Sequence, residues 1–188
     1  MFLNLAPLKN SKNFRLLYIG QVISFFGSMI SYTALPYQVY IITKSSFLVG
    51  MIGSVQLVPL VLTGLYGGAL ADSMDRRKLL VIAEVLMCLS CGLLIMNTLL
   101  PNPSVLLIFI AAASMSAFVG LHRPSMEALT PQVVRKEDFT NVAALNSFRY
   151  SIGAIAGPAL GGIVIAQFGL TAAYSLDLLT FFVSLVCL

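Results

Sequence analysis

Five ionisable side chains interrupt the long apolar runs of this 188-residue chain: Glu84, Arg123, Glu127, Arg149 and Asp177. A carboxylate or guanidinium removed from water must pair, reach water or exchange a proton, because an isolated charge in an apolar medium is costly. These residues are therefore candidates for ion-pair and proton-transfer chemistry. Arg123 and Glu127 are four residues apart, a spacing that favours an ion pair on one helical face. With Glu84 they form a candidate inner charge network.

The elements that must hold these side chains are predicted to be membrane helices. The chain is 59% hydrophobic and 10% charged, with a mean hydropathy of +0.94, whereas about 25% of the residues of a soluble domain are charged. Residues 16–43 and 45–71 contain no formal charge, and each run exceeds the roughly 20 residues that cross a bilayer core. The alternating pattern of a membrane barrel is absent, so we predict an all-α membrane protein.

Turn residues divide the chain into six predicted transmembrane helices. Pro101, Pro103, Pro131 and Gly169 mark connections between them. The first 13 residues lack a long apolar run, so we expect a retained amino-terminal segment rather than a removable signal peptide. The six helices form one bundle over residues 14–188, with spans at 14–42, 47–71, 78–99, 104–127, 140–167 and 170–188.

Basic residues gather in alternate connections, which predicts the orientation of the bundle. Only Lys44 lies in the opposite loops, so the positive-inside rule places both termini of this membrane protein in the cytoplasm. This asymmetry explains the net charge of +4, and no basic face indicates a nucleic-acid partner. The residues concerned are Lys9, Lys12, Arg15, Arg76, Arg77, Lys78, Arg135 and Lys136.

A stripe of small residues lies in the fifth span. Gly153, Gly157 and Gly161 recur every four residues, so a neighbouring helix can approach to backbone contact there, with Gly162 beside the stripe. Pro158 removes one backbone hydrogen bond and favours a hinge or a sealed interface. The simpler alternative is a tight helix pair.

Arg149 and Asp177 lie at similar predicted heights in neighbouring spans. At 1.5 Å per residue, Arg149 is about 13 Å from one membrane edge and Asp177 about 10 Å from the other. We expect a buried ion pair between them. It either couples the protein to protons, with Asp177 gaining a proton when Arg149 is displaced, or is purely structural.

Several uncharged polar residues within the spans need partners in hydrocarbon. Each either hydrogen-bonds a neighbouring helix or lines a cavity that accepts a solute. His122 is interpreted as an interfacial residue, and Cys88 and Cys91 as packing residues, so no metal site or cofactor is indicated. The candidate cavity residues are Gln21, Tyr32, Tyr37, Gln38, Gln56 and Asn146.

Asp72 follows the second span at the negative end of the helix dipole, so it requires a positive partner such as Arg76 or the amino terminus of another helix. The surrounding sequence, Gly68-Ala-Leu-Ala-Asp72-Ser-Met-Asp75-Arg76-Arg77-Lys78, resembles the loop 2/3 signature of the major facilitator superfamily. The run from Gly153 to Gly162 is similar to the antiporter signature of that superfamily. Ser73 and Asp75 depart from the usual Arg and Gly of the loop signature.

The resemblance extends over the whole chain. Within the superfamily, the chain resembles the branch that contains the enterobactin exporter and related drug and macrolide efflux proteins. It implies the amino-terminal six-helix half of a twelve-helix transporter, in which Gly68, Asp72, Asp75, Arg76 and Arg77 form a conformational latch. The implied function is proton-coupled efflux of a small molecule by alternating access. The implied partners are the lipid bilayer, protons, the solute and either a carboxyl-terminal half or a second copy of the chain.

Two alternatives from other classes remain open. One is a six-helix scaffold or subunit that transports nothing and acts only as a dimer. The other is an intramembrane enzyme, which lacks a credible catalytic cluster, so we expect no enzyme. The sequence also lacks a phosphate-binding Gly-x-x-x-x-Gly-Lys-[Ser/Thr] motif, which argues against direct use of ATP.

Overall fold

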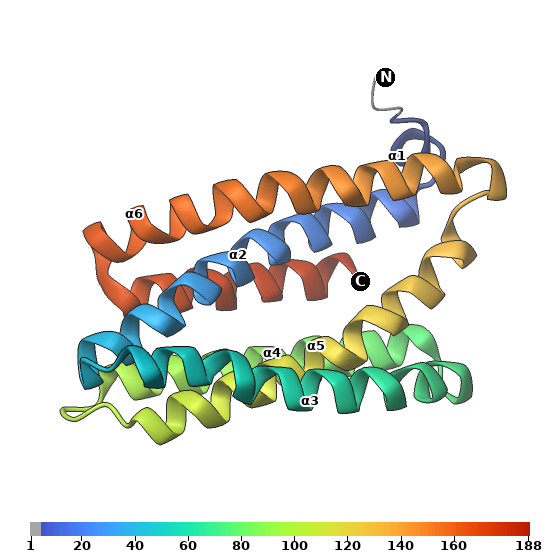
Figure 1. Cartoon of the computed structure of the whole chain (residues 1–188). Helices are drawn as coiled ribbons and strands as arrows, with labels where there is room; N and C mark the ends of the chain where they lie inside the picture. The colour runs from blue at the N-terminus through green and yellow to red at the C-terminus, as the bar shows by residue number, and fades with distance from the viewer. Residues whose placement is uncertain (1–4) are drawn as a thin grey trace.

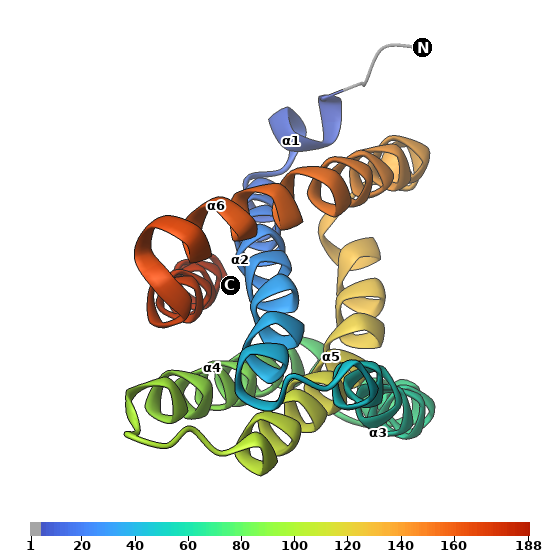
Figure 2. The ribbon, with the colours of Figure 1, turned by 60° about the vertical axis from the view of Figure 1, so that its left-hand side comes forward.

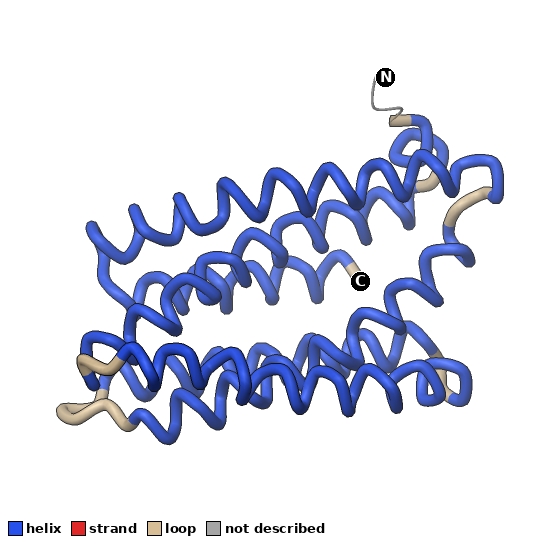
Figure 3. The backbone as a smooth tube through the Cα atoms, in the orientation of Figure 1, coloured by secondary structure: helices blue, strands red, loops and turns tan. Residues whose placement is uncertain are grey.

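The computed structural model describes residues 5–188, apart from the side chains of Ala71 and Asp72, and contains no strand in that part of the chain. Five of the described helices are long and apolar enough to cross a membrane (Figures 1 and 3). The predicted all-α class is confirmed. The helices are α1 (Ala6–Asn10), α2 (Lys12–Thr43), α3 (Ser46–Ser73), α4 (Arg76–Leu99), α5 (Val105–Val133) and α6 (Phe139–Cys187), with a 3-10 turn, η1 (Lys136–Asp138), before α6.

The predicted fifth and sixth spans form one continuous helical run, α6. Gly169 interrupts it with φ 81° and ψ 177°, a conformation that disfavours any residue with a Cβ. The chain reverses direction there, so the segment 170–187 runs back beside the bundle (Figure 1). Its 18 residues correspond to about 27 Å of helix, close to the thickness of a hydrocarbon core. Gly169 thus produces the turn that the sequence predicts.

Polar caps explain why the other helices begin where they do. The Ser11 and Ser45 side chains accept hydrogen bonds from backbone N–H groups in the first turns of α2 and α3. Asp75 accepts from the N–H groups of Arg77 and Lys78 at the start of α4. Each cap satisfies donors that the helix itself leaves unpaired.

The end of α5 differs from the sequence prediction. The predicted span ended at residue 127, with Thr130-Pro131 closing the helix, but α5 continues to Val133 and includes both Pro124 and Pro131. A proline removes only its own N–H donor and keeps a helical φ, so the remaining bonds carry the helix on. The Thr130 hydroxyl also donates to the carbonyl of Met126 at 2.8 Å.

The helices pack in two groups that meet at α4, α5 and α6. Helix α2 lies along α6, whereas α3 and α4 lie along α5 (Figure 2). The main core between the groups includes Ala34, Leu94, Ile108 and Tyr174, all fully buried. Side chains of α3, in contrast, are mostly exposed and apolar, as expected of a helix that faces lipid or another protein segment.

The basic connections meet at one end of the bundle, which we call the basic end. The Ser11 hydroxyl donates to the Val133 carbonyl at 2.8 Å, joining the start of α2 to the end of α5. Arg76 Nη1 donates to the Ala128 carbonyl at 2.9 Å, which attaches the start of α4 to the same region. Several buried polar side chains of the bundle lie at a common depth measured from this end.

Candidate functional site

Five polar side chains from four helices form a layer inside the bundle. Each lies eight to eleven residues from the basic end of its helix, or about 12 to 17 Å along the helix axis. This depth approaches the middle of a hydrocarbon core about 30 Å thick. The polar layer comprises Gln21 of α2, Glu84 of α4, His122 and Arg123 of α5, and Arg149 of α6.

Glu84 is the buried centre of this layer. Its side chain is fully buried, and its Oε1 accepts hydrogen bonds from Gln21 Nε2 at 2.9 Å and Ser184 Oγ at 2.8 Å. His122 Nε2 lies 3.3 Å from the same oxygen and 3.3 Å from Gln21 Nε2, and its contact with Glu84 is the one contact within 4 Å between a carboxylate and a basic side chain among the described residues. Glu84 Oε2 has no hydrogen-bond partner. The carboxylate therefore connects α2, α4, α5 and the last segment of α6.

The predicted inner charge network is wrong in its partners. Arg123 does not pair with Glu127; instead Arg123 Nη2 donates to the Tyr150 hydroxyl of α6 at 3.0 Å. Glu84 pairs with His122, which the sequence analysis treated as an isolated interfacial residue. Counting residues from the helix ends would have put Glu84 and His122 at one depth. That count does not show which faces of α4 and α5 are in contact.

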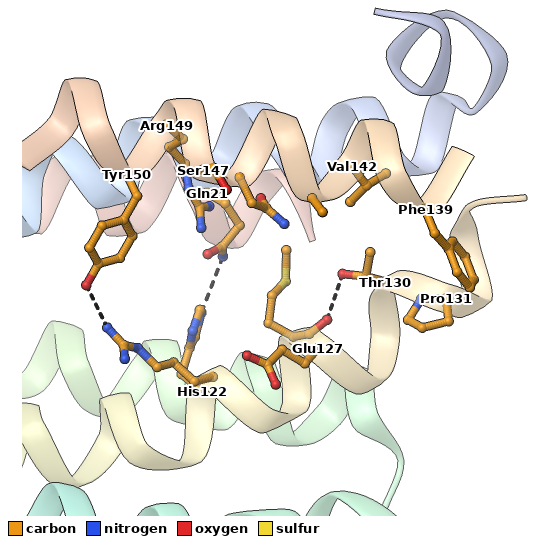
Figure 4. A pocket seen from close by; sticks show the side chains of 14 residues that line it. Gln21, His122, Glu127, Thr130, Pro131, Phe139, Val142, Ser147, Arg149 and Tyr150 are labelled. Atoms are coloured by element: carbon orange, nitrogen blue, oxygen red, sulfur yellow. Dashed lines mark hydrogen bonds between the residues drawn. The ribbon is translucent and has the colours of Figure 1, made fainter. Parts of the chain in front are cut away.

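A cavity of about 520 Å³ opens on one side of the polar layer, between α2, α5 and the first segment of α6 (Figure 4). Arg123, Arg149 and His122 line it together with Tyr150 and Glu127. Its size lies in the range typical of small-molecule sites. The wall is completed by Gln21, Met126, Thr130, Pro131, Phe139, Val142, Ala143, Asn146 and Ser147.

Two of the six predicted cavity residues, Gln21 and Asn146, line this cavity. Tyr32 and Tyr37 are exposed on the surface of α2. Gln38 is buried and accepts a hydrogen bond from the Tyr174 hydroxyl at 2.8 Å, so it links α2 to α6. Gln56 lies in α3, away from the cavity wall. Residue type alone therefore did not distinguish the polar residues that line the cavity from those that link two helices.

The predicted ion pair between Arg149 and Asp177 is not formed. Arg149 lies over the Phe25 ring, 5.5 Å from its centroid, and contributes to the cavity wall. Asp177 is fully buried on the other segment of α6, where Ser28 Oγ donates to Oδ1 at 3.4 Å. Cys91 Sγ contacts Oδ2 at 3.9 Å. The two side chains have similar heights, but they point to different parts of the bundle.

The glycine stripe of α6 packs against α2. A Cβ added at Gly153 or Gly157 would meet Phe25 or Met29, respectively, and one at Gly161 would lie 3.2 Å from Thr33 Cβ. Gly162 has open space around it. The stripe therefore allows α2 and α6 to approach closely, and none of its glycines lines the cavity. Pro158 lies within α6, and the residue with a non-helical backbone conformation in that run is Gly169 rather than Pro158.

The loop motif between α3 and α4 is described only in part. The side chain of Asp72 lies outside the described residues. Asp75 caps α4, Arg76 binds the Ala128 carbonyl, and Arg77 is exposed beside the carboxyl-terminal Leu188. An added Cβ at Gly68 would meet nothing, whereas one at Gly67 would lie 2.9 Å from the Gly120 carbonyl oxygen. Gly67, rather than Gly68, is therefore the glycine at which α3 closely approaches α5 near this loop.

Membrane-length helices around a charged cavity define a multi-pass membrane protein. The family described as transmembrane secretion effectors, within the major facilitator superfamily, matches residues 3–188, and the chain belongs to it. The predicted superfamily is therefore confirmed. Family and relatives point to a transporter rather than an enzyme.

Among curated proteins, the chain is similar to enterobactin exporters called EntS. It is 30% identical to the protein of Salmonella choleraesuis over 188 residues and 30% identical to that of Citrobacter koseri over 192 residues. Each match covers 98% of this chain and 44% of the relative. The chain therefore spans less than half the length of these relatives. No solved structure matches it.

Proposed function

We propose that the chain forms the amino-terminal half of a proton-coupled exporter that moves a small molecule by alternating access. The observation that carries this proposal is the 520 Å³ cavity with charged walls inside a bundle of membrane helices. A second bundle, supplied by further sequence or by a second copy of the chain, would cover the exposed face of α3. The proposed setting is the bacterial inner membrane, with the basic end in the cytoplasm.

Transport in proteoliposomes tests this function. The complete reading frame is reconstituted, and enterobactin is the first solute to test, since the curated relatives are named for its export. We expect uptake into vesicles of the appropriate orientation to follow an imposed pH gradient and to stop when an ionophore collapses it. Solute movement that ignores the gradient would exclude proton coupling. Absence of movement for a range of solutes would favour the scaffold alternative.

Asp177 is the proposed proton-coupling residue. It is buried without an ion-pair partner among the described residues, and a carboxyl group in such surroundings can exchange a proton during a helix movement. We expect Asp177→Asn to reduce gradient-driven flux about tenfold or more while solute exchange at equal pH continues. The matched control is Glu137→Gln, which changes an exposed carboxylate outside the cavity wall. Unchanged gradient-driven flux in Asp177→Asn would remove Asp177 from coupling.

The loop between α3 and α4 is proposed as a latch at the basic end. The Arg76 bond to the α5 backbone supports a role in joining α4 to α5, and Asp72 is proposed to bind the opposing half. We expect the joint change Asp72→Asn, Arg76→Gln and Arg77→Gln to shift the inward-to-outward balance by about tenfold. Cysteine accessibility at the two ends of the bundle measures that balance. The corresponding change of Lys136 and Glu137 to glutamine is the control, and an unaltered balance in the loop variant contradicts the latch.

A further inference from the structure

Two arginines of the cavity have no carboxylate partner. Among the described residues Arg149 Nε is buried without a hydrogen-bond partner, and its guanidinium lies 5.5 Å from the centroid of the Phe25 ring. Arg123 donates to a neutral hydroxyl, that of Tyr150, at 3.0 Å. Both arginines lie ten residues from the basic end of their helices, about 15 Å deep.

The described carboxylates near the polar layer do not neutralise these arginines. Glu84 is shared by Gln21, His122 and Ser184. Asp177 contacts Ser28 and Cys91. Glu127 lines the same cavity but forms no ion pair with either guanidinium. The cavity wall therefore carries two guanidinium groups and one carboxylate, and neither guanidinium forms an ion pair with a described carboxylate.

An uncompensated arginine at this depth of a membrane requires water or an anion beside it. A guanidinium presents a planar set of N–H donors that matches a carboxylate or phosphate, and it remains charged throughout the physiological pH range. Gln21, Asn146 and Tyr150 add uncharged hydrogen-bonding groups to the wall. The cavity thus combines positive charge, polar donors and the volume of a small-molecule site.

We infer that this cavity binds a small organic anion through Arg149 and Arg123. The inference rests on the proposed function and specifies its substrate class: the exported solute carries a carboxylate, phosphate or similar acidic group. The same chemistry is present in the headgroup of an anionic lipid. The experiment therefore separates a soluble anion from a lipid.

Binding is measured on the 188-residue chain in nanodiscs of zwitterionic lipid. Because the sequence contains no tryptophan, Phe139→Trp introduces a single fluorescent reporter into the cavity wall. The probes are an aryl carboxylate, its neutral amide and the matching amine. We expect the carboxylate to bind about tenfold more tightly than either analogue, with an affinity that falls as salt is added. Equal binding of all three probes would overturn the inference.

Arg149→Gln in the reporter chain supplies the residue test. We expect carboxylate affinity to fall about tenfold or more, and Arg149→Lys to restore part of it, since lysine keeps the charge but not the planar fork. Arg135→Gln is the matched control, because Arg135 lies outside the cavity wall. Should Arg149→Gln fail to fold by circular dichroism, Arg123→Gln provides the same test. Undiminished carboxylate binding in a folded arginine variant would overturn the assignment.

Nanodiscs that contain anionic lipid distinguish the two sources of the anion. A soluble anion site is supported if the probe still binds at a similar affinity in anionic lipid. Loss of probe binding there, recovered as the fraction of anionic lipid is lowered, would assign the site to a lipid headgroup and overturn the solute assignment. Flux separates this inference from the proposed function: transport of neutral or cationic solutes without anion binding contradicts only the inference. Anion binding without transport contradicts only the exporter proposal.

Discussion

Replacing Glu84 with alanine is expected to lower the free energy of unfolding by about 3 kcal/mol. Gln21 Nε2 and Ser184 Oγ donate to its Oε1 in a fully buried site, and His122 Nε2 lies 3.3 Å from the same oxygen. Alanine would remove the acceptor of the Ser184 hydroxyl, would leave Gln21 Nε2 with only its contact to His122, and would create a void between four helices. Equilibrium unfolding in mixed micelles, followed by circular dichroism, measures the change.

Two further variants make the Glu84 prediction specific. Glu84→Gln retains an acceptor oxygen, so we expect it to lose about half as much stability as Glu84→Ala. Glu127→Ala removes an exposed carboxylate from the cavity rim and should change stability by no more than about 0.5 kcal/mol. Equal stability of Glu84→Ala and the parent chain would show that the buried hydrogen bonds contribute no net stability.

Replacing Gly120 with alanine is expected to cost about 2 kcal/mol because α3 and α5 are in backbone contact at this position. The added Cβ would meet the Thr63 hydroxyl and would lie 2.8 Å from the Leu60 carbonyl oxygen and 2.9 Å from the Gly64 nitrogen. The backbone atoms cannot move aside as a flexible side chain can. The helices must therefore separate, which thermal unfolding detects as a lower midpoint.

Gly162→Ala is the matched control for Gly120→Ala. It introduces the same methyl group into a membrane helix, but nothing lies within 4 Å of the added Cβ. Alanine is the better helix former by about 1 kcal/mol, so this variant should be neutral or slightly stabilising. A Gly120→Ala protein as stable as Gly162→Ala would mean that α3 and α5 are not held in close contact.

The sequence analysis singled out Glu84 without its partners, and it did not identify Gly120. Gly120 has no glycine at a spacing of four residues, so a search for repeated glycines alone did not select it, although Ser116 and Ala112 continue a small-residue spacing. The contact becomes visible only when the α3 backbone is placed beside α5. The Gly153, Gly157 and Gly161 stripe was detectable because its period is local, although its partner, α2, was not.

The sequence by itself determined the membrane class and the positions of the helices. Apolar runs long enough to span a bilayer and the turn at Gly169 depend on neighbouring residues, so they can be read along the chain. The motifs at residues 68–78 and 153–162 also indicated the superfamily, which the family match confirms.

Only the tertiary structure decided which polar side chains meet. Residue counting gives the height of a side chain along a helix but not the direction in which it points, nor which helix lies opposite. Arg149 and Asp177 have compatible heights and face different surroundings, whereas Glu84 and His122 meet because α4 packs on α5. The partners of a buried charge depend on rotation and neighbourhood, which arise when distant segments of the chain pack together.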